Sequence, residues 1–206
     1  MKSLIIIGMG GQSKVAADVA LRQGYNIIGY VDDNCHEGNP SYLCSLNDFI
    51  NRVDCHIHEV FIAIGNNKIR EEIVKQFNSL SIRYATLIDP SAITSPSAVI
   101  KEGTLVMPGS VINANSMIGS HSIVNTSSSV DHDCIIEDFV HLSPGVHLAG
   151  GVTVKKGAHL GIGCVVIPFI RIGERAIIGA GAAVVKDVPS KVTAVGVPAK
   201  IIKKHG

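Results

Sequence analysis

Three adjacent residues, His132, Asp133 and Cys134, carry the side chains best suited to chemistry in this 206-residue chain. An unperturbed imidazole titrates near neutral pH, so His132 can take a proton from an attacking nucleophile. A neighbouring carboxylate such as Asp133 can fix the tautomer of the ring and favour its protonated state after transfer. The thiol of Cys134 would need to become a thiolate to react, which burial opposes. The stretch predicts general-base chemistry, against the simpler interpretation of a surface His-Asp pair without a role.

Three of the histidines that follow His132 lie within the next 27 residues. His141 and His159 are separated by 18 residues, and His147 lies between them. A row of histidines invites a metal-site hypothesis, but zinc sites combine a varied ligand set with a closed geometry. We therefore expect no metal.

A glycine-rich turn near the start of the chain has the chemistry of a phosphate site. Gly8-Met9-Gly10-Gly11 resembles half of a dinucleotide-binding fingerprint, although the third glycine of that motif is replaced by Ser13. The free backbone N–H groups of such a turn still face a phosphate. Asp32-Asp33 ends the next apolar run, where an acid can bind a ribose or sugar hydroxyl. Gly65 follows a third apolar run. The simpler interpretation of this glycine is that it belongs to an ordinary turn.

The elements that must position this turn alternate between strand and helix. Strands are predicted at residues 3–7, 26–31 and 60–64, and helices over residues 12–23 and 68–80. The short connections imply a small parallel sheet, at whose carboxyl edge Gly10, Asp32 and Gly65 meet. NAD binding is the alternative use of this edge, but about 90 residues leave no room for the second half of a dinucleotide fold.

The rest of the chain has a period of six. Every sixth residue from Ile100 to Val184 is Ile, Leu or Val. The position four residues later, from Thr104 to Val188, is mostly small and never charged. A short strand plus a corner fits this period, and three such units close one triangular coil of 18 residues. About five coils are expected between Ile93 and Val188, with His141 and His159 stacked at the usual strand spacing of about 4.8 Å.

Composition excludes several classes of function. The formal net charge is +1, so no basic excess exists to neutralise nucleic-acid phosphates. No apolar stretch is long enough for a membrane span, and no signal peptide is expected. The five cysteines form no C-x-x-C pair, which favours a reduced, cytoplasmic protein.

Five segments together resemble one known family. They are Ile7–Lys14, Asp32-Asp33, Ala63–Asn67, Asn125–Cys134 and Val195–Lys200. In this order they are similar to the NeuD/PglD type of left-handed β-helix, hexapeptide-repeat acyltransferases, which includes sialic acid O-acetyltransferases and nucleotide-aminosugar N-acetyltransferases. The predicted fold is therefore an α/β Rossmann-like domain at residues 1–89, followed by an all-β left-handed parallel β-helix with a C-terminal tail at residues 90–206.

The resemblance implies specific partners and roles. It implies a homotrimer with acetyl-CoA between neighbouring subunits, a nucleotide sugar on the N-terminal domain, and His132 as the base aided by Asp133. Many relatives have Glu where this chain has Asp133, and His where it has Gln12. The residues implied to bind the cofactor are His141, Ile162 and Ala180. Those implied to bind the substrate are Gly10, Gly11, Gln12, Asp32, Asp33, Gly65 and Asn125.

Alternatives remain for two of these residues and for the function. His141 is also consistent with a packed histidine, and Asn125 with an inward asparagine ladder. The first functional hypothesis is acetyl-CoA-dependent N-acetylation of a UDP- or dTDP-linked 4-amino sugar in bacterial surface-glycan biosynthesis. The alternatives are O-acetylation of a sialic acid and a non-catalytic scaffold that binds a nucleotide sugar; the His132-Asp133 pair argues against the scaffold.

Overall fold

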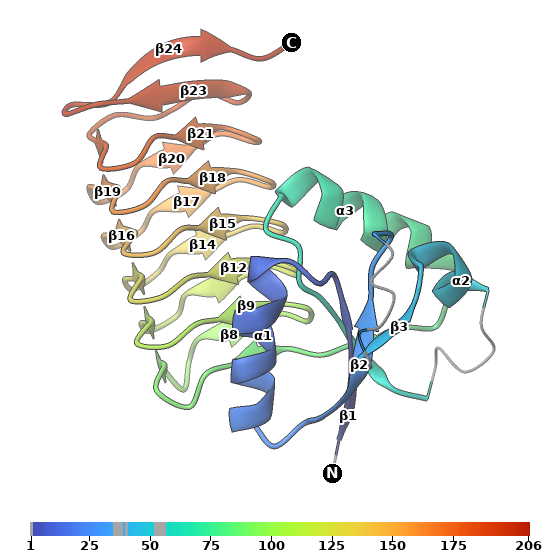
Figure 1. Cartoon of the computed structure of the whole chain (residues 1–206). Helices are drawn as coiled ribbons and strands as arrows, with labels where there is room; N and C mark the ends of the chain where they lie inside the picture. Colours follow the sequence, from blue (N-terminus) through green and yellow to red (C-terminus); the bar gives the residue numbers. More distant parts are fainter. Residues whose placement is uncertain (1, 35–38, 40, 52–56) are drawn as a thin grey trace. The chain divides into compact units, whose positions relative to one another are not determined.

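The computed structural model describes residues 2–34, 39, 41–51 and 57–206, and the chain divides into two compact units, Met1–Pro90 and Ser91–Gly206 (Figure 1). The first unit is an α/β structure. Its elements are β1 (Ser3–Ile7), α1 (Gly11–Arg22), β2 (Asn26–Val31), β3 (Tyr42–Cys44), α2 (Leu46–Ile50), β4 (Glu59–Ile62), α3 (Asn67–Gln76), the 3₁₀ turn η2 (Phe77–Ser79), β5 (Arg83–Tyr84) and β6 (Leu87–Ile88).

The sheet of the first unit is parallel, with strand order β3-β2-β1-β4-β5. β1 is central, so Ile7 at its carboxyl end lies beside Val31 of β2 and Ile62 of β4. These three apolar residues are buried in a core that also contains Phe49 and Phe77. The chain leaves β1 toward β2 on one side and returns to β4 on the other. Ligands of open parallel sheets bind outside the carboxyl ends at such a reversal.

Some helices and strands begin or end at residues other than those predicted, because local hydrogen bonds set their ends. α3 begins at Asn67 because Asn66 Oδ1 accepts the N–H groups of Lys68 at 3.0 Å and Ile69 at 3.2 Å, which caps the helix. It ends at Gln76, and the predicted remainder continues as η2. β3, α2 and β5 are not predicted from the sequence, because elements of two to five residues are too short to show a period.

The second unit is a left-handed parallel β-helix built from two-residue strands. These are β7 (Ile93–Thr94), β8 (Val99–Ile100), β9 (Leu105–Val106), β10 (Val111–Ile112), β11 (Met117–Ile118), β12 (Ile123–Val124), β13 (Ser129–Val130), β14 (Ile135–Ile136), β15 (His141–Leu142), β16 (His147–Leu148), β17 (Thr153–Val154), β18 (His159–Leu160), β19 (Val165–Val166), β20 (Arg171–Ile172), β21 (Ile177–Ile178) and β22 (Ala183–Val184).

Three sheets form the sides of this prism, and each strand pairs with the strand one coil on. Their orders are β7-β10-β13-β16-β19-β22, β8-β11-β14-β17-β20, and a third that runs β9-β12-β15-β18-β21. The predicted aliphatic column points inward, so Ile118 pairs with Ile136 and both are buried. We name each edge by the strands that flank it in the middle coil: the β13–β14 edge, the β14–β15 edge and the β15–β16 edge.

Two features of the sequence make these edges regular. One residue in most turns has a positive φ, a conformation that Gly, Asn and Asp tolerate best; it is glycine at several positions and Asn115 and Asp133 on the β13–β14 edge. A column of buried serines lies just inside the corners, and each hydroxyl donates to a carbonyl in the next coil. Their acceptors lie 15 residues on: Ser110 to Asn125, Ser116 to Asp131, Ser122 to Glu137 and Ser128 to Ser143.

The prism ends in a hairpin of different geometry. β23 (Val192–Val195) continues the parallel stack on β21, whereas β24 (Lys200–Lys204) runs antiparallel to β23 with all five residues exposed (Figure 1). Within the described residues, no helix combines the length and hydropathy needed to span a membrane.

Candidate active site

The His132-Asp133 pair lies in the turn between β13 and β14, on the β13–β14 edge. His132 Nδ1 lies 2.8 Å from Asp133 Oδ2, and both side chains are more than half exposed. The carboxylate can only accept, so Nδ1 carries the proton and Nε2 has the lone pair. The backbone of Asp133 has a φ of 59°, a conformation that aspartate tolerates better than most residues. The shorter acid therefore makes the bond to the imidazole.

Neighbouring groups hold the two acids that flank His132. Asp131 Oδ1 accepts the backbone N–H of His132 at 2.8 Å and the side-chain amide of Asn113 at 3.0 Å. Asp133 Oδ1 accepts the side-chain amide of Asn115 at 3.2 Å. Both asparagines lie one coil before the acids that they contact. The carboxylates are thus fixed by hydrogen bonds, even though solvent surrounds them.

This arrangement favours the protonated form of the histidine. The hydrogen bond to Asp133, followed by the charge of Asp131, raises the pKa of His132 above its ordinary value. In return, the hydrogen bond from His132 lowers the pKa of Asp133, and the backbone N–H of His132 lowers that of Asp131. The ring is therefore a stronger base than a free imidazole, while both carboxylates stay charged near neutral pH.

Space for the imidazole comes from a glycine one coil further on. A Cβ atom on Gly150 would lie 2.6 Å from both Cε1 and Nε2 of His132, closer than any real contact allows. The ring therefore rests against bare backbone at Gly150. Any larger residue there would displace the imidazole ring.

A buried serine fixes the turn from inside the prism. Ser116 Oγ donates to the carbonyl of Asp131 at 2.6 Å and accepts the backbone N–H of Cys134 at 3.1 Å. It thereby holds both ends of the turn that carries His132. Cys134 itself is fully buried, its Sγ donates to the carbonyl of Ala149, and burial raises its pKa. This thiol is shielded from any acyl donor in solvent.

The residues implied to bind the cofactor lie on other parts of the prism. His141 is buried on β15 and stacks on His159, with ring centroids 4.8 Å apart as the coil spacing predicts. Its Nε2 lies 3.3 Å from Nδ2 of Asn125, which is half-buried and points outward rather than into an inward ladder. Ile162 and Ala180 are exposed at equivalent turn positions one coil apart, on the β15–β16 edge. His132 thus lies on a different edge of the chain from Ile162 and Ala180.

The glycine-rich turn of the first unit is joined to the end of β2. Met9 donates its backbone N–H to Asp32 Oδ2 at 2.7 Å, and Asp32 Oδ1 accepts from Asn34. Asp33 Oδ1 instead accepts the backbone N–H of Leu46, the first residue of α2. Asp32 therefore fixes the conformation of the turn, whereas Asp33 bonds the first residue of α2.

The start of α1 leaves donors available beside this turn. Gly10 and Gly11 are exposed, nothing lies within 4 Å of an added Cβ at either, and Gly10 caps α1 without a side-chain bond. Gln12 Nε2 is buried and has no hydrogen-bond partner among the described residues. Gly65, after β4, approaches Gln12 Oε1, since a Cβ on it would lie 3.9 Å away. The structure thus brings Gly10, Gln12, Asp32 and Gly65 to one sheet edge.

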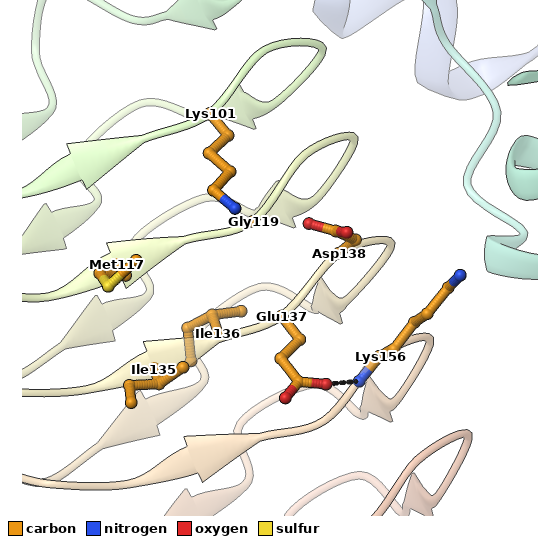
Figure 2. A pocket seen from close by; sticks show the side chains of 8 residues that line it. All are labelled: Lys101, Met117, Gly119, Ile135, Ile136, Glu137, Asp138 and Lys156. Carbon is orange, nitrogen blue, oxygen red and sulfur yellow. Dashed lines mark hydrogen bonds between the residues drawn. The ribbon is translucent and has the colours of Figure 1, made fainter. Parts of the chain in front are cut away.

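A pocket of about 180 Å³ lies elsewhere, on the β14 sheet and the β14–β15 edge (Figure 2). Lys101 points toward Asp138, and the Glu137 carboxylate accepts the backbone N–H of Lys156 at 3.0 Å. Lys155 pairs with Glu137 as well. The acids here are already engaged, and the pocket does not include His132. Within the described part of the chain, no group of three or more metal-ligating side chains is found.

Comparison with known proteins decides the family. Residues 3–77 match the family model described as the PglD N-terminal domain. A histidine-to-alanine variant of GDP-perosamine N-acetyltransferase from Caulobacter crescentus, solved with CoA and GDP-perosamine, is 36% identical, with 98% of both chains covered and a TM-score of 0.93. The acetyltransferase domain of PglB from Neisseria gonorrhoeae, solved with acetyl-CoA, is 34% identical over 98% of this chain and 99% of that one, with a TM-score of 0.91.

The chain belongs to the NeuD/PglD-type family of hexapeptide-repeat acyltransferases. The predicted family and fold class are confirmed. Curated relatives match only in part: a serine acetyltransferase of Buchnera aphidicola is 50% identical over 52 residues, which is 25% of this chain and 19% of that protein. The chain thus matches about a fifth of the length of that relative.

Several residues that shape the two sites of this NeuD/PglD-type chain were not predicted from the sequence. Asn113, Asn115 and Gly150 could have been found by stepping one coil of 18 residues from the 131–133 turn. Arg70 could not. It is buried, donates to the carbonyl of Ile64 at 2.7 Å, and thereby braces the loop after β4. Burial lowers its pKa to about 9, so it remains cationic at neutral pH.

Proposed function

We propose that this chain transfers the acetyl group of acetyl-CoA to the amine of a nucleotide-linked 4-amino sugar, with His132 as the general base. The observation that carries the proposal is the 2.8 Å contact between His132 Nδ1 and Asp133, which leaves Nε2 as the basic atom of a side chain that is more than half exposed. Relatives that cover the whole chain support the donor and the class of acceptor, since one was solved with CoA and an amino-sugar nucleotide. For this chain we expect a UDP- or dTDP-linked acceptor.

The proposed reaction is a direct transfer in a ternary complex. The acceptor nitrogen attacks the thioester carbonyl, and its proton passes to His132 Nε2. The C–S bond then breaks, and the CoA thiolate leaves and takes up a proton. Asp133 stabilises the imidazolium that forms, as the carboxylate does in a Ser-His-Asp triad. The buried thiol of Cys134 supports a reaction without an acetyl-enzyme.

The oxyanion formed on the thioester carbonyl needs a donor near the imidazole. The backbone of Gly150 is the part of the prism against which the ring rests. The carbonyl of Gly150 accepts the backbone N–H of Phe169. Gly150 is the second residue of its turn. The N–H at that place makes no hydrogen bond within a β-turn. We propose the Gly150 N–H as the oxyanion donor.

The two sets of site residues argue for assembly. His132 lies on the β13–β14 edge, whereas Ile162 and Ala180 lie on the β15–β16 edge. One acetyl-CoA can contact both sets only if the edges come from two chains packed side by side. We therefore propose a homotrimer with the cofactor between subunits. Light scattering at micromolar concentration tests it, because a fully active monomer is incompatible with a shared site.

The function is tested by following thiol release from acetyl-CoA with a panel of acceptors: UDP-, dTDP- and GDP-linked 4-amino sugars, and free and CMP-linked sialic acid. We expect turnover with an amino-sugar nucleotide and none with sialic acid. His132→Ala should lower kcat by about 10²–10⁴-fold. His147→Ala is the matched control, since His147 is exposed on β16 and bonds Ser129. An unaltered rate in His132→Ala would refute the proposed base.

A further inference from the structure

The last coil of the prism and the hairpin that follows it carry a concentration of positive charge. Residues 186–204 contain five lysines and a single acid, whereas the whole chain has a formal net charge of +1, so the rest of the chain is net negative. That acid, Asp187, already accepts a backbone N–H of β20 at 2.8 Å. Among the described residues, no carboxylate pairs with the exposed lysines of β24, which are Lys200, Lys203 and Lys204.

Aliphatic side chains lie exposed among these lysines. Val197, in the turn of the hairpin, is 77% exposed, and Ile202 on β24 is 65% exposed. Ile202 is the extra residue of a β-bulge, because its neighbours on β24 pair with Thr193 and Ala194, which are adjacent on β23. A bulge at a sheet edge changes the direction of a side chain. The edge strand therefore presents an aliphatic group and cations to solvent together.

Protection of the sheet edge accounts for only part of this composition. Lysines on an edge strand prevent a second chain from pairing with it. Exposed aliphatic side chains such as Val197 and Ile202 have the opposite effect, because apolar surface promotes association. β24 is also remote from the proposed base. In the strand order β24-β23-β21-β18-β15 it lies four strand spacings, about 19 Å, from β15 of the middle coil (Figure 1).

We propose that the hairpin of β23 and β24 binds the surface of an anionic lipid bilayer. The lysines of β24 contact the headgroups, and Val197 and Ile202 lie at the boundary with the acyl chains. Basic and aliphatic side chains together are typical of segments that lie on a membrane, and each lysine near an anionic surface strengthens binding about fivefold. Nucleic acid fits this surface less well, since residues 186–206 contain no Arg, Phe, Tyr or Trp to stack on bases.

Sedimentation of the full-length protein with vesicles tests the proposal. At low salt the wild type should sediment with vesicles of phosphatidylglycerol and phosphatidylcholine in equal parts, and stay in solution with phosphatidylcholine alone. Lys203→Gln combined with Lys204→Gln should weaken binding about 25-fold. Ile202→Ser should weaken it about tenfold, because an aliphatic side chain no longer leaves water. The matched control is Lys68→Gln with Lys75→Gln, which neutralises two exposed lysines of α3 and should bind like the wild type.

Calorimetry with CoA separates a lipid surface from a phosphate site for a small molecule. The double variant of Lys203 and Lys204 should keep the thermal midpoint and the CoA affinity of the wild type. Joint loss of CoA and vesicle binding in that variant would overturn the inference. Equal binding of the wild type to both kinds of vesicle, unaffected binding in the double variant, or tighter binding to single-stranded RNA than to vesicles would overturn it as well. Failure of the wild type to bind CoA would refute the proposed function and leave the result with vesicles unchanged.

Discussion

The turn at residues 131–134 and the glycine-rich loop at residues 8–12 both follow a strand, but they differ in whether their polar groups have hydrogen-bond partners. In the prism turn, Asp131 and Asp133 are each held by an asparagine of the preceding coil, and Ser116 bonds both ends of the turn. In the loop, α1 starts without a side-chain cap, and Gln12 Nε2 has no partner among the described residues. The polar groups of the prism turn are thus held by partners within the chain, whereas the loop leaves a buried amide without one among the described residues.

The largest expected effect tests whether the prism core supports the turn. Ile136→Lys would bury a charge between coils and lower the free energy of unfolding by several kcal/mol. Ile135→Lys, on the same strand but 46% exposed, is the control and should change it little. Thermal unfolding measures both. An unchanged midpoint for Ile136→Lys would mean that the inward column is assigned incorrectly.

The next effect tests the proposed base, His132. Asp133→Asn removes the largest cause of the raised pKa of His132, so the imidazole loses its proton at lower pH. Because only the neutral ring accepts a proton, the acidic limb of the pH–rate profile should move to lower pH. The kcat should fall by less than for loss of His132, since the base remains. An acidic limb that stays in place would show that Asp133 does not tune the ring.

A smaller effect tests the two hydrogen bonds by which Ser116 holds the turn at residues 131–134. Ser116→Ala removes the bonds to the Asp131 carbonyl and the Cys134 N–H, and should cost about 1 kcal/mol in unfolding free energy. Ser122→Ala, one hexad later, removes the corresponding bonds to the Glu137 carbonyl and the Val140 N–H and serves as control. Both should lose similar stability, but only Ser116→Ala should also lower kcat. Equal kcat values in the two variants would show that the hydrogen bonds of Ser116 do not position His132.

The smallest effect on stability is expected in the loop. Gln12→Ala removes a buried amide that has no partner, so the free energy of unfolding should stay the same or rise slightly. If that amide binds the sugar nucleotide, the KM for the acceptor should rise several-fold while the KM for acetyl-CoA stays constant. Steady-state kinetics with both substrates decide it. A lower free energy of unfolding would mean that Gln12, like the acids of the prism turn, stabilises the fold through contacts within the chain.

How much could be predicted differs between the two regions for a physical reason. In the prism the period fixes the register, so Ile136 and Cys134 were assigned inward and the stack of His141 on His159 followed from a step of 18. The first unit has no such period. The role of Asp33 in holding Leu46, and of Arg70 in bracing the loop after β4, depends on contacts that sequence spacing does not encode.

The reversed last strand has a consequence for the behaviour of the protein in solution. A parallel stack of identical coils has no intrinsic end, because each coil offers the next a complete row of backbone donors and acceptors. β24 runs in the opposite direction and places Lys200, Lys203 and Lys204 at the open side. Repeated positive charge on an edge strand repels a second copy. Within this sheet, the hairpin thus replaces an open parallel edge with a charged antiparallel strand.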